Sequence, residues 1–234
     1  MTFQPKLSLT FSAILSALVL TACQPQQQDV EDKDIPVQKH SGDKNSVKSG
    51  LSDPLVEHIY TADPSAHVFN GRLYIYPSHD VESGIPQNDN GDHFDMRDYH
   101  ILSMDEVGGE VTDHGVALSV KDIPWAGRQL WAPDAAYKDG TYYLYFPLKD
   151  KNDVFHIGAA TSDKPEGPFV PEAEPIEGSY SMDPAVFKDD DGAYYMYFGG
   201  IWGGQLQRYE GGTYNPEDVY PADDAPAVKP RIAK

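Results

Sequence analysis

Basic residues are scarce in this sequence. Lysine and arginine together number 18 against 37 aspartates and glutamates, which gives a formal net charge of -19. Proteins that bind nucleic acid need clustered positive charge to neutralise phosphate groups. The composition therefore excludes nucleic acid as an expected partner and suits neutral or cationic ligands better.

Cysteine is rarer still, since Cys23 is the only one, and no disulfide can form within the chain. It follows Lys6 and an apolar run from Leu7 to Leu20, a pattern typical of a secretory signal. At about 14 residues, this run is shorter than the roughly 20 that a membrane-spanning helix needs. The segment Leu20-Thr21-Ala22-Cys23 resembles the bacterial lipobox, in which the cysteine is lipidated. The alternative, in which Cys23 is a buried free thiol at the end of a core helix, fits poorly with the glutamines that follow it.

Aromatic residues are absent from the segment after Cys23, as far as about Leu51, which is rich in glutamine, aspartate, lysine, serine and glycine. Such a segment buries too little apolar surface to offset its ordering entropy. The sequence therefore predicts a lipoprotein signal peptide over 1–22, a flexible tether over 23–51 and a folded domain over 52–234. Because Gln24 rather than aspartate follows the cysteine, the lipobox analogy predicts an anchor in the outer membrane of a bacterium.

What the chain does contain favours strands. It has 15 tyrosines, 9 phenylalanines, 20 glycines and 19 prolines, a composition typical of many short strands joined by tight turns. We therefore expect an all-β fold.

One hairpin pattern occurs three times in the domain. In each copy a proline opens a short apolar strand, a glycine turn follows, and tyrosines recur three and five residues after the glycine. Residues two apart share a face of a strand, so the paired tyrosines should pack on one side. The copies are Asp63–Tyr76, Ala132–Tyr145 and Asp183–Tyr197, with turns at Asn70-Gly71, Asp139-Gly140 and Asp191-Gly192.

The spacing of these hairpins is too long for a simple meander and suits four-stranded modules, as in the blades of a β-propeller. Three such hairpins in residues 52–234 are therefore expected to form about three blades. A two-sheet sandwich is the alternative.

Acidic residues recur at one position of the repeat. Asp63 and Asp183 directly precede the proline of the first and third hairpins, and Asp134 follows the proline of the second. In a propeller the first strand of each blade lines the central channel, so these carboxylates should converge. The alternative is that Asp-Pro only initiates a turn.

These motifs resemble those of glycoside hydrolase family 43. They are Tyr60-Thr61-Ala62-Asp63-Pro64-Ser65, Trp131-Ala132-Pro133-Asp134 and Ser181-Met182-Asp183-Pro184-Ala185. The resemblance covers the N-terminal part of that family's domain and implies a five-bladed β-propeller of the β-xylosidase or α-L-arabinofuranosidase type. It also implies an inverting mechanism, in which base and acid stand roughly 6.5 to 9.5 Å apart.

The same resemblance implies a role for each aspartate. Asp63 matches the general base, Asp183 matches the carboxylate that orients the general acid and modulates its pKa, and Asp134 matches a supporting position. The acid itself is a glutamate on a later blade of the family fold. Glu210 and Glu217 lie in loop-like sequence without a surrounding hairpin, so the acid is expected to be absent from this chain. The alternatives are then a non-catalytic sugar-binding lipoprotein and an inactive fragment.

Other polar and aromatic residues are candidates for substrate binding. Trp131 and Trp125 could stack on sugar rings or pack in the fold, and Arg128 and His79, next to Asp80, could bond to hydroxyls. The polar loop over 87–95 is interpreted as a substrate rim rather than a calcium loop, because it lacks the EF-hand spacing. No metal ligand or cofactor is expected in this chain, although the resemblance allows calcium in the complete family fold. The expected ligand is a xylo- or arabino-oligosaccharide, and the only expected membrane contact is the lipid anchor.

Overall fold

The computed structural model describes residues 54–200, 205–209, 211, 213–217, 224, 226 and 229–234. The predicted signal peptide, Cys23 and the tether lie outside these residues. Within the described part of the chain, no helix is both long and apolar enough to cross a membrane.

The first sheet is a four-stranded antiparallel meander, with the order β1-β2-β3-β4. Its strands are β1 (Tyr60–Phe69), β2 (Arg72–Asp80), β3 (Asp98–Met104) and β4 (Thr112–Ser119). The long connection over 81–97, between β2 and β3, extends beyond the sheet. A short 3-10 helix, η1 (Val120–Asp122), leads out of β4 and is capped by Ser119.

The second sheet has β7 at its centre. Strands β6, β7, β8 and β9 form an antiparallel meander, and β5 adds to β7 at its far end. The bounds are β5 (Ala126–Arg128), β6 (Asp134–Lys138), β7 (Thr141–Asp150), β8 (Phe155–Ser162) and β9 (Val170–Pro171).

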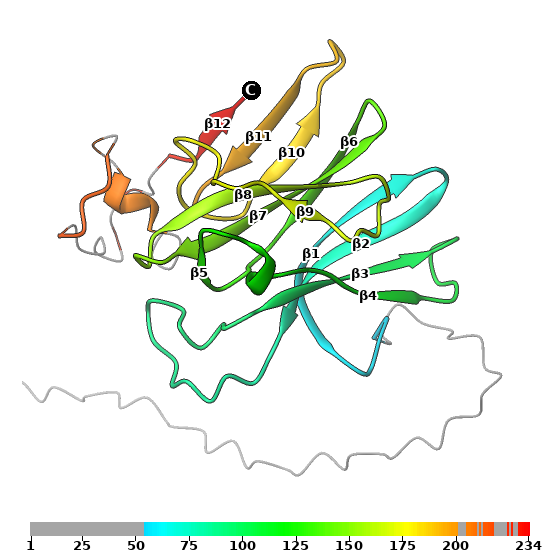
Figure 1. Ribbon diagram of the computed structural model, residues 1–234, viewed down its shortest axis with the longest axis horizontal. Coiled ribbons are helices and arrows are strands. Elements are labelled where there is room, and N and C mark those ends of the chain that lie inside the picture. The colour runs from blue at the N-terminus through cyan, green and yellow to red at the C-terminus, as the bar shows by residue number, and fades with distance from the viewer. Residues whose placement is uncertain are drawn as a thin grey trace, which may run out of the picture. The chain divides into compact units, whose positions relative to one another are not determined.

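The third sheet contains β10 (Ala185–Lys188), β11 (Tyr194–Phe198) and β12 (Arg231–Ala233). A 3-10 helix, η3 (Leu206–Tyr209), lies between β11 and β12 in sequence. Figure 1 shows the three sheets following one another, with β1, β6 and β10 as the first strands of their hairpins. β6 contacts both β1 and β10, as expected for neighbouring blades. The prediction of an all-β fold with about three propeller blades is confirmed, and the sandwich alternative is wrong.

Two of the three predicted hairpin turns have the expected form. Asn70-Gly71 and Asp139-Gly140 have positive φ at both residues (53° and 78°, 52° and 91°) and join strands paired right up to the turn. This conformation matches the right-handed twist of the flanking strands. The third turn differs, because β10 and β11 pair only as far as Lys188 and Tyr194, and only Gly192 has positive φ.

The core lies between the sheets. Tyr74 and Tyr76 of β2 are buried on one face, as the repeat predicts for its first copy, whereas Tyr197 of the third copy is 44% exposed. The two buried tyrosines pack with residues of the second sheet such as Leu144 and Phe146. A smaller cluster of Ile157, Met196 and Phe198 joins the second sheet to the third. Another cluster, of Ile75, Leu102 and Met104, lies on the opposite face of the first sheet.

Candidate functional site

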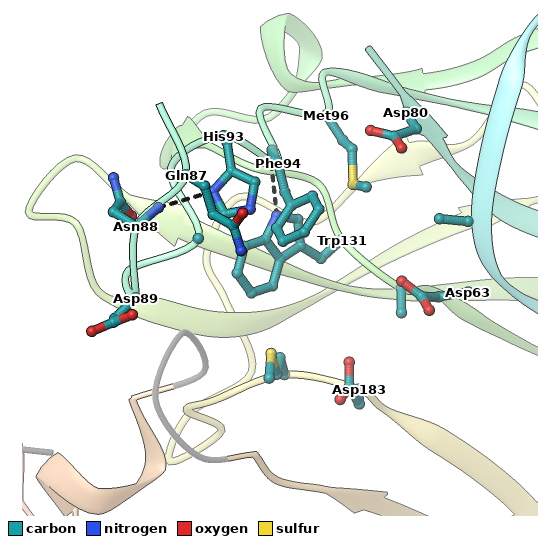
Figure 2. A pocket seen from close by; sticks show the side chains of 14 residues that line it. Asp63, Asp80, Gln87, Asn88, Asp89, His93, Phe94, Met96, Trp131 and Asp183 are labelled. Atoms are coloured by element: carbon teal, nitrogen blue, oxygen red, sulfur yellow. Dashed lines mark hydrogen bonds between the residues drawn. The ribbon is translucent and has the colours of Figure 1, made fainter. Parts of the chain in front are cut away.

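One pocket of about 590 Å³ collects residues from all three hairpins. Figure 2 shows the carboxylates of Asp63, Asp80 and Asp183 on one side of it, and the rings of Phe94 and Trp131 on the other. The complete lining is Ala62, Asp63, Asp80, Gln87, Asn88, Asp89, Gly91, His93, Phe94, Met96, Trp131, Ala132, Met182 and Asp183. The structure therefore brings Asp63 and Asp183 together, although 120 positions separate them in the sequence.

A β-bulge places Asp63 in this pocket. Strand β1 pairs with β2 at Ala62–Ser78 and again at Ser65–Tyr76, so Asp63 and Pro64 together face one residue of the partner strand. Proline has no N–H for the ladder and is tolerated at such irregular positions. The bulge leaves Asp63 with a φ of 46°, in the left-handed region. Bulges of this kind commonly re-aim a side chain beside a functional site.

Asp183 has the same unusual backbone. Its φ is 54°, and Ser181, two residues earlier, has a φ of 93°. The residue remains exposed as a whole. Neighbouring atoms nevertheless surround its carboxyl group: this partial burial, and then the negative charge of Asp63, raise the pKa of Asp183 to about 6. The two carboxylates therefore interact electrostatically across the pocket.

The loop over 81–97, which contains the segment 87–95 predicted as a substrate rim, forms the aromatic wall of the pocket together with Trp131. Trp131 lies just before β6 and donates from Nε1 to the carbonyl of Phe94 at 2.8 Å. Its ring contacts Phe155 on the other side, with ring centroids 4.7 Å apart. Gly91 has a φ of 69°, and a Cβ there would lie only 2.7 Å from the Trp131 ring. The loop and Trp131 are therefore packed against each other through a position that only glycine fits.

Charged residues outside the pocket hold this loop in place. Arg128 bridges Asp92 of the loop and Asp153 of the turn between β7 and β8, at 2.7 Å to each. Burial works against ionisation of Asp92, but its hydrogen bonds with Arg128 and Asn88 hold its pKa below the usual range. Arg128 therefore anchors the rim, and it does not line the pocket as the predicted hydroxyl ligand would.

A buried lysine lies under the same loop. The Lys149 side chain is fully enclosed, and its Nζ donates to the carbonyl of Asn90 at 3.4 Å. Burial lowers the pKa of Lys149 to about 8, against the attraction of Asp153 and Asp92. This residue gave no signal in the sequence, because a lysine near the end of a strand is most often exposed.

Two other predicted substrate ligands are not in the pocket. Trp125 is buried in the core, where it stacks on Phe146 with an interplanar angle of 7°. His79 instead contacts Asp98, with Nδ1 and Oδ1 2.6 Å apart. The predicted pair of stacking tryptophans is thus reduced to Trp131.

Asp134 occupies the junction of the three sheets. It is buried, and its carboxylate accepts hydrogen bonds from His67 Nε2 (2.6 Å), the N–H of Ala135 (2.8 Å) and the N–H of Val186 (2.6 Å). These donors belong to β1, β6 and β10 respectively. Asp134 therefore joins the first strands of three blades and is not among the residues that line the pocket.

Met96 and Met182 were not predicted to line the pocket, and Phe94 was predicted only as part of the rim loop over 87–95. Phe94, Met96 and Met182 come from segments without regular periodicity, and the rings and thioethers meet only in three dimensions. Asp80 was noticed only as the neighbour of His79. It is the last residue of β2, and because residues two apart share a face of a strand, its even spacing from Tyr74 and Tyr76 was the signal available in the sequence. The pocket as a whole combines an acidic side, able to polarise water, with a flat aromatic side that suits the apolar face of a sugar ring.

Comparisons with known proteins agree with this architecture. The family model described as "Glycosyl hydrolases family 43" matches residues 109–217. The chain is 62% identical over 181 residues to a xylosidase/arabinosidase of Bacteroides ovatus, and 64% identical over 189 residues to xylosidase/arabinosidase 43A of Humicola insolens. These alignments cover 77% of this chain in both cases, but 56% and 58% of the relatives. The chain therefore spans little more than half of their length.

Solved structures give the same result. The crystal structure of CoXyl43, a GH43 β-xylosidase/α-arabinofuranosidase from a compost microbial metagenome in complex with xylotriose, is 73% identical with a TM-score of 0.75. It is matched over 77% of this chain and 56% of its own. The GH43_1 enzyme of Xanthomonas citri, complexed with xylose, is 58% identical with a TM-score of 0.71 and covers 78% and 53% of the respective chains. The chain belongs to glycoside hydrolase family 43.

Proposed function

We propose that this protein hydrolyses O-glycosidic bonds of xylose- or arabinose-containing oligosaccharides with inversion at the anomeric carbon. The observation that carries the proposal is the pair Asp63 and Asp183, which reach one pocket from equivalent positions of the first and third hairpins. Their positive φ values cost conformational energy, and strained backbone of this kind clusters at functional sites. The wall of Trp131 and Phe94 opposite the acids suits a sugar ring.

In the proposed reaction Asp63 is the general base. Its carboxylate takes a proton from a water molecule while that oxygen bonds to the anomeric carbon, on the face opposite the departing oxygen. The glycosidic C–O bond breaks, and the departing oxygen takes a proton from a general acid. Asp183, whose charge acts on the same pocket, would orient that acid and help to keep it protonated by like-charge repulsion.

The described lining of the pocket offers four aspartates and no glutamate. A sugar leaving group must be protonated to depart, whereas a 2,4-dinitrophenolate departs without a proton. A base-only site would therefore hydrolyse the dinitrophenyl glycoside and spare xylobiose, and this contrast separates the contribution of Asp63 from that of the acid. The calcium that the resemblance allows in the complete family fold has no convergent three-residue ligand set in the described pocket, and no step proposed here uses it.

The test is the purified protein with 2,4-dinitrophenyl β-D-xyloside and the corresponding α-L-arabinofuranoside. Asp63→Asn should lower kcat by about 10²–10⁴-fold, the usual contribution of a general base. Asp89→Asn, which changes a carboxylate on the rim of the same pocket, is the matched control and should leave kcat within a few fold. Equal rates for Asp63→Asn and the parent would sink the proposal.

Xylose-type substrates are proposed from the relatives. Both curated relatives described above are named xylosidase/arabinosidases, and the related crystal structures hold xylotriose or xylose. The ratio of kcat/KM for the two aryl glycosides, one with xylose and one with arabinofuranose, decides which pentose is preferred.

A second candidate function is sugar binding without turnover. It is favoured by the lack of a glutamate in the described lining of a pocket that still has an aromatic wall. Calorimetry with xylotriose distinguishes the two: binding that is weakened by Trp131→Ala, with no hydrolysis of either aryl glycoside, would favour this candidate.

We also propose that the protein is exported and lipidated on Cys23, which would hold it at the bacterial outer membrane. The support is the apolar run over 7–20 followed by Leu20-Thr21-Ala22-Cys23. Mass spectrometry of the membrane fraction should find a lipid on Cys23, and Cys23→Ala should release the protein from that fraction. A parent protein without lipid would contradict this.

A further inference from the structure

Two histidines and one aspartate converge at the end of the first sheet, outside the pocket. His79 lies at the end of β2, Asp98 begins β3, and His100 follows on the same strand. One ligand atom from each lies within 4.8 Å of the others, and the structure describes no other such group of three. None of these residues lines the pocket.

Both histidines direct a ring nitrogen at one carboxylate oxygen of Asp98. His79 Nδ1 is 2.6 Å from Asp98 Oδ1, and His100 Nε2 is 3.9 Å from the same atom. The two imidazole rings are edge to face, with centroids 4.9 Å apart. This arrangement brings two imidazole nitrogens and a carboxylate oxygen within 4.8 Å of one another.

A second layer orients His100. Its Nδ1 is 3.0 Å from both carboxylate oxygens of Asp113, and because an ionised carboxylate only accepts, Nδ1 must carry the hydrogen. In the neutral ring, Nε2 then presents its lone pair toward Asp98 and His79. Asp113 is itself held by the N–H of Gly115 at 2.8 Å and by His58 Nε2 at 2.6 Å. A carboxylate behind a histidine in this way is characteristic of metal sites.

We propose that His79, Asp98 and His100 bind a divalent transition-metal ion, with Zn²⁺ as the best match. Two imidazole nitrogens and one carboxylate suit Zn²⁺, whereas Ca²⁺ and Mg²⁺ take oxygen ligands. The side chains are 20%, 25% and 15% exposed, so solvent reaches them and a water molecule can serve as a further ligand. Coordination would take the place of the hydrogen bond between His79 and Asp98.

The proposed metal site lies at the base of the loop that lines the pocket. His79 and Asp98 stand at the two ends of the connection over 81–97, and that connection supplies Gln87 through Met96 of the pocket lining. An ion shared by the two ends would fix the base of the loop. The proposal rests on these contacts alone and does not depend on the proposed hydrolysis.

The test is calorimetric titration of the full-length, chelator-treated protein with Zn²⁺. One equivalent should bind, and affinity should fall at least tenfold in His79→Ala and in His100→Ala. Asp113→Asn keeps all three ligands and should weaken binding by about 10–100-fold, the usual effect of losing an outer-layer partner. Thermal melts of each variant without metal confirm that it is folded.

The matched control is His156→Ala. His156 also faces a carboxylate, with Nε2 3.5 Å from Asp150, but it belongs to no three-residue group among the described residues. Zn²⁺ affinity should be unchanged in this variant. No Zn²⁺ binding by the parent, equal loss in the His79 and His156 variants, or tighter binding of Ca²⁺ than of Zn²⁺ would each overturn the proposal.

Discussion

The junction of the three sheets and the pocket use the same residue type in opposite ways. At the junction, Asp134 is buried and accepts hydrogen bonds from three strands. In the pocket, Asp183 is exposed, and its carboxyl group has a raised pKa. The two residues occupy nearly the same place in their hairpins, on opposite sides of the proline. What separates a structural carboxylate from one available for chemistry is therefore the number of donors that the fold directs at it.

The backbone divides the two regions in the same way. Asp134 begins a regular strand that pairs with Tyr145, whereas Asp63 and Asp183 have positive φ. Such conformations cost about 1–3 kcal/mol each. The pocket therefore carries strain that the bonded junction does not, and the following variants test this division.

The largest effect is expected at the junction. Asp134→Ala removes the acceptor for the N–H groups of Val186 and Ala135, and each buried donor left unsatisfied costs about 1–3 kcal/mol. We expect the free energy of unfolding to fall by about 2–4 kcal/mol, measured by urea denaturation. Asp183→Ala serves as the comparison and should not destabilise the protein at neutral pH. Equal losses in the two variants would break the distinction.

An intermediate effect is expected in the loop. Gly91 and Gly84 both lie in the connection over 81–97 with φ near 70°, but only Gly91 has a neighbour, Trp131, within reach of a new Cβ. Gly84→Ala should cost about 1 kcal/mol for the left-handed conformation. Gly91→Ala should cost a further 1–3 kcal/mol or so from overpacking and shift the tryptophan emission spectrum. Identical melting temperatures and spectra would show that the loop yields without moving Trp131.

The smallest effect is expected from Asp183→Asn. The pKa of Asp183 is raised to about 6 in the folded protein. The protonated carboxyl group therefore stabilises the folded state in full below about pH 4, and this stabilisation is lost as pH rises through about 6. Asparagine cannot ionise, so the variant should gain stability relative to the parent between pH 4 and 7.5, by less than about 1 kcal/mol because the residue is exposed.

Melting temperatures at the two pH values measure this difference. It should shrink in an Asp63→Asn background, because the charge of Asp63 is the second cause of the raised pKa. A variant that instead loses stability relative to the parent as pH rises would contradict the assignment.

Much of the fold follows from local patterns in the sequence. The Asn70-Gly71 and Asp139-Gly140 turns and the alternating tyrosines are encoded within single hairpins, so they could be predicted. The convergence of Asp63 and Asp183 could be predicted because both occupy one register position of a repeat. The third turn was less predictable, since its consecutive aspartates allow more than one loop conformation.

The remaining features depend on contacts between distant segments. Trp125 and Trp131 look alike in sequence, but Trp125 stacks on Phe146 in the core while Trp131 meets the loop at Phe94. Similarly, His79 was expected to reach a sugar hydroxyl, but the neighbouring strand places Asp98 beside it. No local pattern distinguishes these outcomes, because the deciding partner lies on a strand or loop that is distant in the sequence.

The bonds of Asp134 also have a bearing on the order of folding. Its partners His67 and Val186 are 67 and 52 residues away along the chain, whereas each hairpin pairs residues only a few positions apart at its turn. Closing a long loop costs conformational entropy, and contacts between distant residues therefore form slowly. We therefore expect the hairpins to form early and the carboxylate to find its donors late, so that its loss would speed unfolding more than it slows folding.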